Sequence, residues 1–189
     1  MRKMDEKVLC VPAGSYFDDF DRFVREKGRW LVRKYAEKNA GYRHIIPYCV
    51  IMAPNSKRIL AYQRKGNEKR LDGQWSIGIG GHVHPHDGRK GDFNTVLNAR
   101  DRKCIEELGI EPHKTFGEIY IQLDETEADR VHLGFCQIIT EWHGDFTPSE
   151  EIPEWEMLTF EELEHKNLET WAQYVIDLLE SGWGDLFDK

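Results

Sequence analysis

The most constraining feature of this sequence is one long helical segment that stands among shorter segments typical of strands. Residues 94–108 are expected to form this helix, and Gly109 follows, which suits the left-handed backbone that commonly ends a helix. Segments typical of strands precede and follow it, at 45–52, 58–64, 75–83, 116–123, 131–142 and 155–160. Strands and helices mix without strict alternation, which predicts an α/β sandwich around a mixed sheet.

Both ends of the chain predict additions to this sheet. A short strand at 7–12 is followed by a helix start at Ser15 to Asp18 and by apolar residues at helical spacing as far as Tyr35. A final amphipathic helix is expected over 160–180. A chain of 189 residues suits one domain with a short extension. We therefore expect an N-terminal strand and helix extension, residues 1–40, packed on a main domain of residues 41–189.

Charge and hydropathy limit the partners of the protein. The formal net charge is -8, whereas proteins that bind nucleic acid are usually basic. No apolar run approaches the roughly 18 residues that span a bilayer, and the N-terminus does not resemble a signal peptide. The cysteines are widely spaced, so we expect reduced and mostly buried thiols at Cys10, Cys49, Cys104 and Cys136. The sequence predicts a soluble, cytoplasmic protein without a nucleic-acid or membrane partner.

Glu106 and Glu107 place two adjacent carboxylates on the predicted helix. At about 100° per residue, one side of the helix is the expected buried stripe and the other carries Ala99 and the charged residues. That stripe consists of Leu97, Cys104, Ile105 and Leu108. Paired carboxylates can bind Mg²⁺ or Mn²⁺, which would neutralise a diphosphate and activate water. A solvated helix face with an Arg102–Glu106 ion pair is the ordinary alternative.

The residues around these carboxylates resemble the Nudix box, Gly-x5-Glu-x7-Arg-Glu-U-x-Glu-Glu-x-Gly-U, in which U is a bulky aliphatic residue. Its second half is matched by Arg102, Cys104, Glu106, Glu107, Gly109 and Ile110, and its opening glycine by Gly81. The similarity extends outward over roughly residues 45–165. It implies a Nudix-type α/β/α sandwich. It also implies a metal-dependent hydrolase that cleaves a diphosphate bond in a nucleoside-diphosphate-linked compound.

The resemblance assigns roles to particular residues. Arg102 would organise the adjacent loop, and Glu106 and Glu107 would bind Mg²⁺ or Mn²⁺ together with Glu151 from a later loop. The substrate would be bound by Arg64, Arg70, Gly80, Gly81 and His82. An ordinary solvated loop is the alternative for Glu150 and Glu151 and for the basic residues. Nudix proteins are often dimers, so a homodimer is compatible with the resemblance.

The sequence departs from the Nudix pattern in three ways. Lys103 stands where the family has a metal-binding Glu, and an ammonium group has no lone pair to donate. Asp87 replaces the first Glu, and the segment between Asp87 and Arg102 is longer than in the family. Three hypotheses remain: a pyrophosphohydrolase with a reduced metal site, an impaired nucleotide-binding or regulatory module, and an isomerase that acts on a diphosphate-bearing substrate.

Three histidines alternate in the segment that follows the glycine-rich strand. In an extended chain His82, His84 and His86 would share one face, which suggests a transition-metal site. A milder role is a single imidazole at the phosphate site, acting as a donor or a general base.

Overall fold

The computed structural model describes residues 3–53, 55–64 and 73–183. Contacts within the chain divide it into two compact units, each built from three segments. The first unit comprises Met1–Tyr48, Gly80–Arg102 and Tyr120–Phe135. The second unit comprises Cys49–Ile79, Lys103–Ile119 and Cys136–Lys189.

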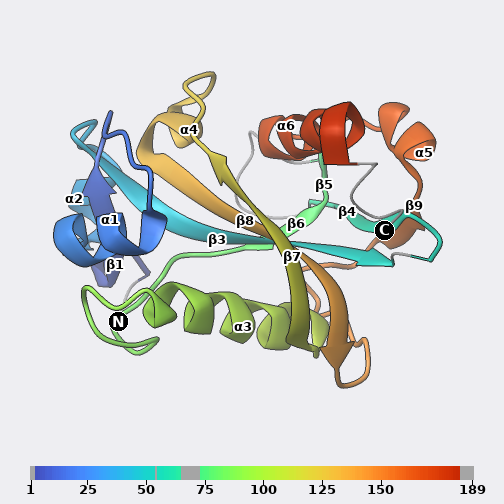
Figure 1. Cartoon of the computed structure of the whole chain (residues 1–189), viewed down its shortest axis with the longest axis horizontal. Helices are drawn as coiled ribbons and strands as arrows, with labels where there is room; N and C mark the ends of the chain where they lie inside the picture. The colour runs from blue at the N-terminus through green and yellow to red at the C-terminus, as the bar shows by residue number, and fades with distance from the viewer. Residues whose placement is uncertain (1–2, 54, 65–72, 184–189) are drawn as a thin grey trace. The chain divides into compact units, whose positions relative to one another are not determined.

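Strands and helices follow one another along the chain in a mixed order (Figure 1). After a short 3₁₀ turn, the first half contains β1 (Lys7–Pro12), α1 (Phe20–Lys27), β2 (Arg29–Val32), α2 (Arg33–Ala36), β3 (Tyr42–Ala53), β4 (Arg58–Gln63), β5 (Trp75–Ser76) and β6 (Gly78–Gly80). The second half contains α3 (Asn94–Leu108), β7 (Glu111–Ile121), α4 (Glu127–Val131), β8 (His132–His143), β9 (Trp155–Leu158), α5 (Phe160–Glu164), α6 (Thr170–Leu178) and a final π-helical turn (Leu179–Trp183).

The sheet is built around β3. Its strand order is β2-β1-β3-β4-β5, β6 and β8 also pair with β3, β7 pairs with β8, and β9 pairs with β4. This mixed sheet with helices confirms the predicted fold class. The glycine-rich segment is two short strands, β5 and β6, rather than the single strand expected over 75–83.

In the first unit, β1 pairs antiparallel with both β2 and β3, and Cys10 lies opposite His44. The core of this unit packs aliphatic residues of β1 and β3 against aromatic residues of α1 and β8, among them Leu9, Val11, Phe20, Phe23, Ile45 and Phe135. The expected helix from Ser15 was wrong. The helix begins after Asp19, whose carboxylate caps it by accepting from the Arg22 amide. Residues 29–32 pair with β1 instead of continuing the helix, because tertiary pairing outweighs local spacing.

In the second unit, β4 is the central strand. It pairs antiparallel with the end of β3, with β5 and with β9. The core of this unit comprises Cys49, Ile51, Leu60, Tyr62, Ile79, Cys104, Leu108, Ile110, Ile139 and Ile152. The expected final helix is divided into α5 and α6, and a capping box at Thr159 begins α5.

Helix α3 has the bounds expected from the sequence, and Gly109 has a φ of 73°, as the helix end requires. The predicted buried stripe was wrong at two positions. Ala99 is fully buried, whereas Ile105 is 51% exposed. The first half of α3 contributes Val96 and Ala99 to the core of the first unit, and its second half contributes Cys104 and Leu108 to the core of the second. The buried face therefore shifts along the helix.

Two further expectations can be compared with the described residues. All four cysteines are free and buried, as predicted. None of the helices described is long and apolar enough to cross a membrane. The expected division into residues 1–40 and 41–189 stays a prediction.

Candidate functional site

An arginine–carboxylate clamp joins α3 to the loop before it. Arg102 Nε donates to Asp87 Oδ1 at 2.6 Å, and Arg102 Nη2 donates to Asp87 Oδ2 at 3.1 Å. The same Nη2 donates to the backbone carbonyl of His82 at 3.1 Å. The Asp87 side chain is buried, and its bidentate pairing fixes both groups in one geometry. Arg102 therefore makes the loop contacts that the resemblance implied.

The electrostatics of Asp87 follow from this clamp. Burial acts to raise the pKa of Asp87, but hydrogen bonds from Arg102 and from the His84 amide, together with the Arg102 charge, outweigh burial and lower it. The His84 amide donates to Asp87 Oδ2 at 2.7 Å. Asp87 is thus a carboxylate whose ionised form the loop stabilises.

The extra length of the loop is folded back on the start of α3. Thr95 Oγ1 donates to the Arg89 carbonyl at 2.8 Å, and Asn98 Nδ2 donates to the Asp87 carbonyl at 2.8 Å. These contacts explain how Arg102 still reaches Asp87 although the segment between them is longer than in the family pattern.

A lysine and two glutamates form the next part of α3, in the second unit. Lys103 Nζ is ion-paired with Glu107 Oε1 and lies 3.6 Å from Glu106 Oε2. The side chain of Glu107 is 11% exposed and that of Lys103 is 16% exposed, whereas Glu106 is 49% exposed. The Lys103 ammonium therefore lies between the Glu106 and Glu107 carboxylates, at the position that a metal ion bound by both would take.

The pKa of Glu107 is raised above its usual value. Burial raises its pKa, the charge of Glu151 raises it further, and Lys103 and Arg64 partly oppose the rise. Glu151 is exposed, yet its loop is tied to the end of α3, where the Ser149 amide donates to the Glu107 carbonyl at 2.8 Å. Carbonyls at a helix end have no partner within the helix, so this loop satisfies one of them.

Arg64 is held by a buried carboxylate that the sequence did not single out as part of the site. Arg64 Nη1 donates to Glu169 Oε2 at 3.0 Å, and Ser76 Oγ donates to Glu169 Oε1 at 2.5 Å. Glu169 is 5% exposed and directly precedes α6. No local pattern connects Glu169 with Arg64, which is 105 positions away in the sequence. Arg70, the other predicted basic residue, lies outside the described residues.

The remaining residues predicted to bind substrate are Gly80, Gly81 and His82, which follow one another closely at the end of β6. A Cβ atom at Gly80 would lie 3.1 Å from the Pro47 carbonyl, so this glycine permits close approach of β6 to β3. Among the described residues, the ligand atoms of His82 do not converge with those of His84 and His86, although the His82 and His84 rings lie with their centroids 6.4 Å apart. His82 lies with His44 and His132, whereas His84 and His86 stack on each other with ring centroids 5.1 Å apart. Gly81 is half-buried at the end of the same segment.

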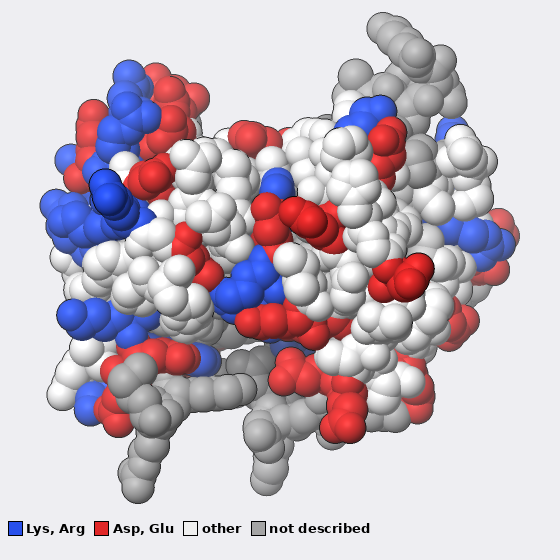
Figure 2. Space-filling view, turned by 90° about the horizontal axis from the view of Figure 1, so that it is seen from below, with Lys and Arg blue, Asp and Glu red and all other residues white. Residues whose placement is uncertain are grey.

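Cationic and anionic side chains are also mixed on the surface of the protein. Figure 2 shows the side of the molecule that α3 occupies in Figure 1. Lys and Arg side chains lie beside Asp and Glu side chains near the middle of this face, rather than in one patch of a single sign. A separate hollow in the first unit contains none of the predicted site residues and is lined by Asp21, Arg25, Gly91, Asp92, Phe93 and Asn94.

Comparisons with known proteins agree with the fold. A family model for the NUDIX domain matches residues 43–179. Protein YmaB of Bacillus subtilis (strain 168) is 28% identical over 210 residues, which cover 95% of this chain and 100% of that protein. The crystal structure of Tm1382, described as a Nudix hydrolase, is 29% identical, with a TM-score of 0.74 over 92% of this chain and 98% of that one.

More distant structures share the fold. A bifunctional NMN adenylyltransferase/ADP ribose pyrophosphatase from Francisella tularensis is 13% identical, with a TM-score of 0.57 over 75% of this chain and 42% of that one. A MutT structure described for Aliivibrio salmonicida and Vibrio cholerae is 16% identical, with a TM-score of 0.54 over 71% of this chain and 94% of that one. The chain belongs to the Nudix family, and it is an enzyme of the Nudix hydrolase type.

Proposed function

We propose that the protein hydrolyses a diphosphate bond in a nucleoside-diphosphate-linked compound, with Mg²⁺ or Mn²⁺ as cofactor. The observation that carries this proposal is the buried carboxylate of Glu107 on the Nudix-box helix, with Glu106 beside it and the charge of Glu151 nearby. Buried carboxylates are costly unless a cation compensates them, and a raised pKa at such a position is a common property of functional sites.

The donor set fits a hard divalent cation. Glu106, Glu107 and Glu151 offer carboxylate oxygens, which Mg²⁺ and Mn²⁺ prefer, and water and substrate phosphates would complete the coordination. When bound, the cation would stabilise charge on the diphosphate and favour an activated water. Lys103 is paired with Glu107, so this ammonium would have to move toward the phosphate oxygens when a cation binds.

The residues around the cluster have separate roles in this proposal. Arg64 is a cation next to the carboxylates, and Glu169 holds its guanidinium in place for a phosphate oxygen. Arg102 acts as a positioning residue, because it fixes the loop from His82 to Asp87. Roles in substrate binding for Arg70, Gly80, Gly81 and His82 stay predictions.

The reaction we propose is simple hydrolysis. The oxygen of water forms a bond to one phosphorus, the bond from that phosphorus to the bridging oxygen breaks, and the bridging oxygen leaves with the second phosphate. The proton released by water passes to a carboxylate of the cluster or to solvent. The bifunctional NMN adenylyltransferase/ADP ribose pyrophosphatase from Francisella tularensis is also described in complex with AMP and a manganese ion, which is compatible with this substrate class and cofactor.

One observation favours a second candidate function. The Lys103 ammonium neutralises Glu107 without any metal, so the site could bind a nucleotide through Lys103 and lack turnover. In that case the protein would be a nucleotide-binding or regulatory module on a Nudix fold.

A hydrolysis screen separates these two functions. Wild-type protein, Glu107→Gln and Lys103→Glu would be incubated with ADP-ribose, NADH, nucleotide sugars, dinucleoside polyphosphates and nucleoside triphosphates, each with Mg²⁺ and with Mn²⁺. Glu111→Gln, an exposed glutamate at the start of β7, is the matched control. The hydrolase proposal predicts metal-dependent products from wild type and from the control. The rate of hydrolysis should fall at least a hundredfold in Glu107→Gln, which corresponds to about 2.7 kcal/mol of activation free energy. Activity that appears only in Lys103→Glu would favour the binding module.

We also propose that the protein acts in the cytoplasm, which is supported by its four free, buried cysteines. A homodimer stays a prediction.

A further inference from the structure

Three histidine side chains converge within the first unit, although they come from separate parts of the chain. His44 lies in β3, His82 follows the end of β6 by two residues, and His132 is the first residue of β8. One potential ligand nitrogen of each ring lies within 4.8 Å of the others. His44 is fully buried, and the other two are half-buried. None of the three contributes to the carboxylate cluster described above.

The spacing of the rings matches coordination of one ion. The ring centroids are 5.1 Å apart for His44 and His82, 5.2 Å for His44 and His132, and 5.7 Å for His82 and His132. Zinc binds imidazole nitrogen at about 2.0–2.1 Å in tetrahedral geometry, which places the centroids of coordinated rings roughly 5 Å apart. The rings therefore need only small rotations to meet a single ion.

One pair of nitrogens is hydrogen-bonded at a separation slightly shorter than that of two ligands on one ion. His82 Nε2 and His44 Nδ1 are 3.0 Å apart. Two nitrogen ligands of a tetrahedral zinc ion are separated by roughly 3.3 Å, because each bond is about 2.0–2.1 Å long. The contact between these two rings can thus be replaced by an ion that both of them bind.

The protonation of these rings suits metal binding. Burial is the main cause that lowers the pKa of His44 to about 3 and the pKa of His82 well below its usual value. Both are therefore neutral near pH 7, as a coordinating imidazole must be. Arg33 contributes to both decreases, and its positive charge is partly compensated by ion pairs with Glu6 and Glu37.

The second nitrogen of His44 has the surroundings of a proton-bearing atom. His44 Nε2 is buried and lacks a partner of standard hydrogen-bond geometry in the part of the chain that the structure describes. The Ala36 backbone nevertheless raises the pKa of His44 against the effect of burial, as a carbonyl acceptor does. Metal-binding histidines commonly donate their second N–H to a carbonyl. A proton on Nε2 leaves the lone pair of Nδ1 directed at His82.

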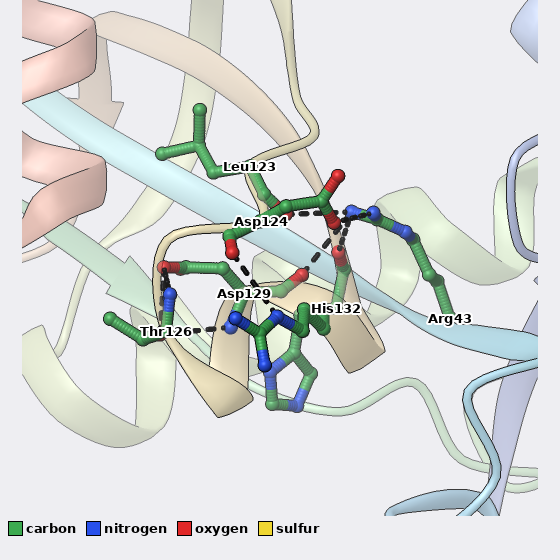
Figure 3. Close-up of polar contacts among 7 residues, drawn as sticks. Arg43, Leu123, Asp124, Thr126, Asp129 and His132 are labelled. Carbon is green, nitrogen blue, oxygen red and sulfur yellow. Dashed lines mark hydrogen bonds and ion pairs between the residues drawn. The ribbon is translucent and has the colours of Figure 1, made fainter.

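Arg43 fixes the position of His132 relative to β3. Its buried guanidinium donates to three backbone carbonyls and one carboxylate around the β7–β8 connection, namely Leu123 at 3.1 Å, Asp129 at 3.2 Å, His132 at 3.2 Å and the Asp124 carboxylate at 2.5 Å. Figure 3 shows these contacts, with the imidazole ring of His132 directed away from the guanidinium. Arg43 precedes His44 in β3, so the two side chains lie on opposite faces of the strand.

We propose that His44, His82 and His132 form a binding site for a transition-metal ion of the zinc class, separate from the carboxylates of α3. Three imidazole ligands suit Zn²⁺, Co²⁺ or Ni²⁺, whereas Mg²⁺ prefers oxygen. Water or another small ligand would occupy the fourth position. Because Arg102 bonds the His82 carbonyl, a metal at this site would also stiffen the loop from His82 to Asp87.

The test uses metal-free full-length protein titrated with Zn²⁺ by calorimetry and with Co²⁺ by visible absorption. The variants are His132→Asn, because this side chain is half-buried, and His82→Asn as a second choice. The double variant His84→Asn/His86→Asn removes the stacked histidine pair nearby, and Glu107→Gln removes the central carboxylate of α3. Urea unfolding of each metal-free variant identifies a variant that fails to fold.

We expect wild type to bind one Zn²⁺ per chain with a Kd on the order of 1 µM or tighter. The Kd should rise by more than about 100-fold in His132→Asn, beyond the 10–100-fold typical of residues outside the ligand set. His84→Asn/His86→Asn should bind as wild type does, and Glu107→Gln should keep the tight imidazole site, whereas any weaker Zn²⁺ binding at the carboxylates of α3 should decrease. The proposal is overturned if wild type does not bind, if folded His132→Asn and His82→Asn bind as tightly as wild type, or if either control variant abolishes binding.

Discussion

Among single residues, Lys103 has the largest influence on the proposed metal site. Its ammonium pairs with the buried carboxylate of Glu107, at the position where the Nudix pattern has a metal-binding glutamate. The lysine therefore compensates in the metal-free protein for a charge that would otherwise be buried alone. This compensation explains why the site can be stable without a cation, and it predicts competition between the lysine and a divalent ion.

Lys103→Ala should destabilise the metal-free protein. The change leaves Glu107 buried beside Glu151 without its main cation, and an unpaired buried charge costs about 1–3 kcal/mol or more. Urea unfolding measures the loss, and added Mn²⁺ should recover part of it in the variant. Lys114→Ala, which breaks the exposed pair with Glu141, should change stability by less than about 1 kcal/mol. Equal effects of the two variants would contradict the role given to Lys103.

Arg102→Lys should weaken the clamp to Asp87 even though the charge is kept. A lysine cannot reproduce two parallel hydrogen bonds to a carboxylate, so we expect a loss of about 1–3 kcal/mol in unfolding free energy. Arg22→Lys, at the exposed pair with Asp18, is the matched control and should be nearly neutral. A neutral Arg102→Lys would show that the clamp does not hold the loop.

Among the elements, α3 is hydrogen-bonded to one loop within each unit. The loop of His82 to Asp87 is bonded to Arg102 on α3, and the loop of Ser149 to Glu151 is bonded to the end of the helix. The helix bounds and its glycine end could be predicted from sequence, because both are local properties. The burial of Ala99 and the exposure of Ile105 could not, because they depend on which cores the two halves of the helix meet.

The clamp makes the stability of the protein sensitive to acid. The folded pKa of Asp87 is lowered, whereas an unfolded Asp titrates near pH ~3.9. The clamp's contribution is therefore fully present above the unfolded pKa and is lost as pH falls through the folded pKa. Unfolding free energies measured from pH 6 down to pH 2 should fall more steeply for wild type than for Asp87→Asn. Parallel pH profiles would count against an ionised Asp87 in the clamp.

Gly109→Ala should perturb the end of α3 and the loop that carries Glu151. The residue has a φ of 73°, and a Cβ atom there would overlap Thr147 Oγ1. Backbone strain alone costs roughly 1–2 kcal/mol, so we expect a loss of at least about 2 kcal/mol once the overlap is included. Gly14→Ala has a similar φ of 68° without neighbours within 4 Å, and it isolates the backbone contribution. Similar losses in both variants would mean that the overlap is relieved without cost.

At the scale of the whole molecule, the sequence predicted the mixed α/β class and the Nudix family, since both follow from element order and one motif. It did not predict contacts between distant segments. A ring nitrogen of His82 contacts His44, 38 positions away, and Glu169 reaches Arg64 across 105 positions. Such pairs depend on strand pairing and tertiary packing, which local spacing does not encode. The expected division near residue 40 stays a prediction.

The reaction that we propose is a metal-dependent attack of water on phosphorus at the Glu107 cluster. The most direct measurement is hydrolysis in water labelled with heavy oxygen, with Mn²⁺ and a compound selected by the screen, for wild type, Glu107→Gln and Glu111→Gln. We expect one labelled oxygen in a phosphate product of wild type and of Glu111→Gln, and little product from Glu107→Gln. Unlabelled products, turnover without a divalent ion, or full activity of Glu107→Gln would contradict it.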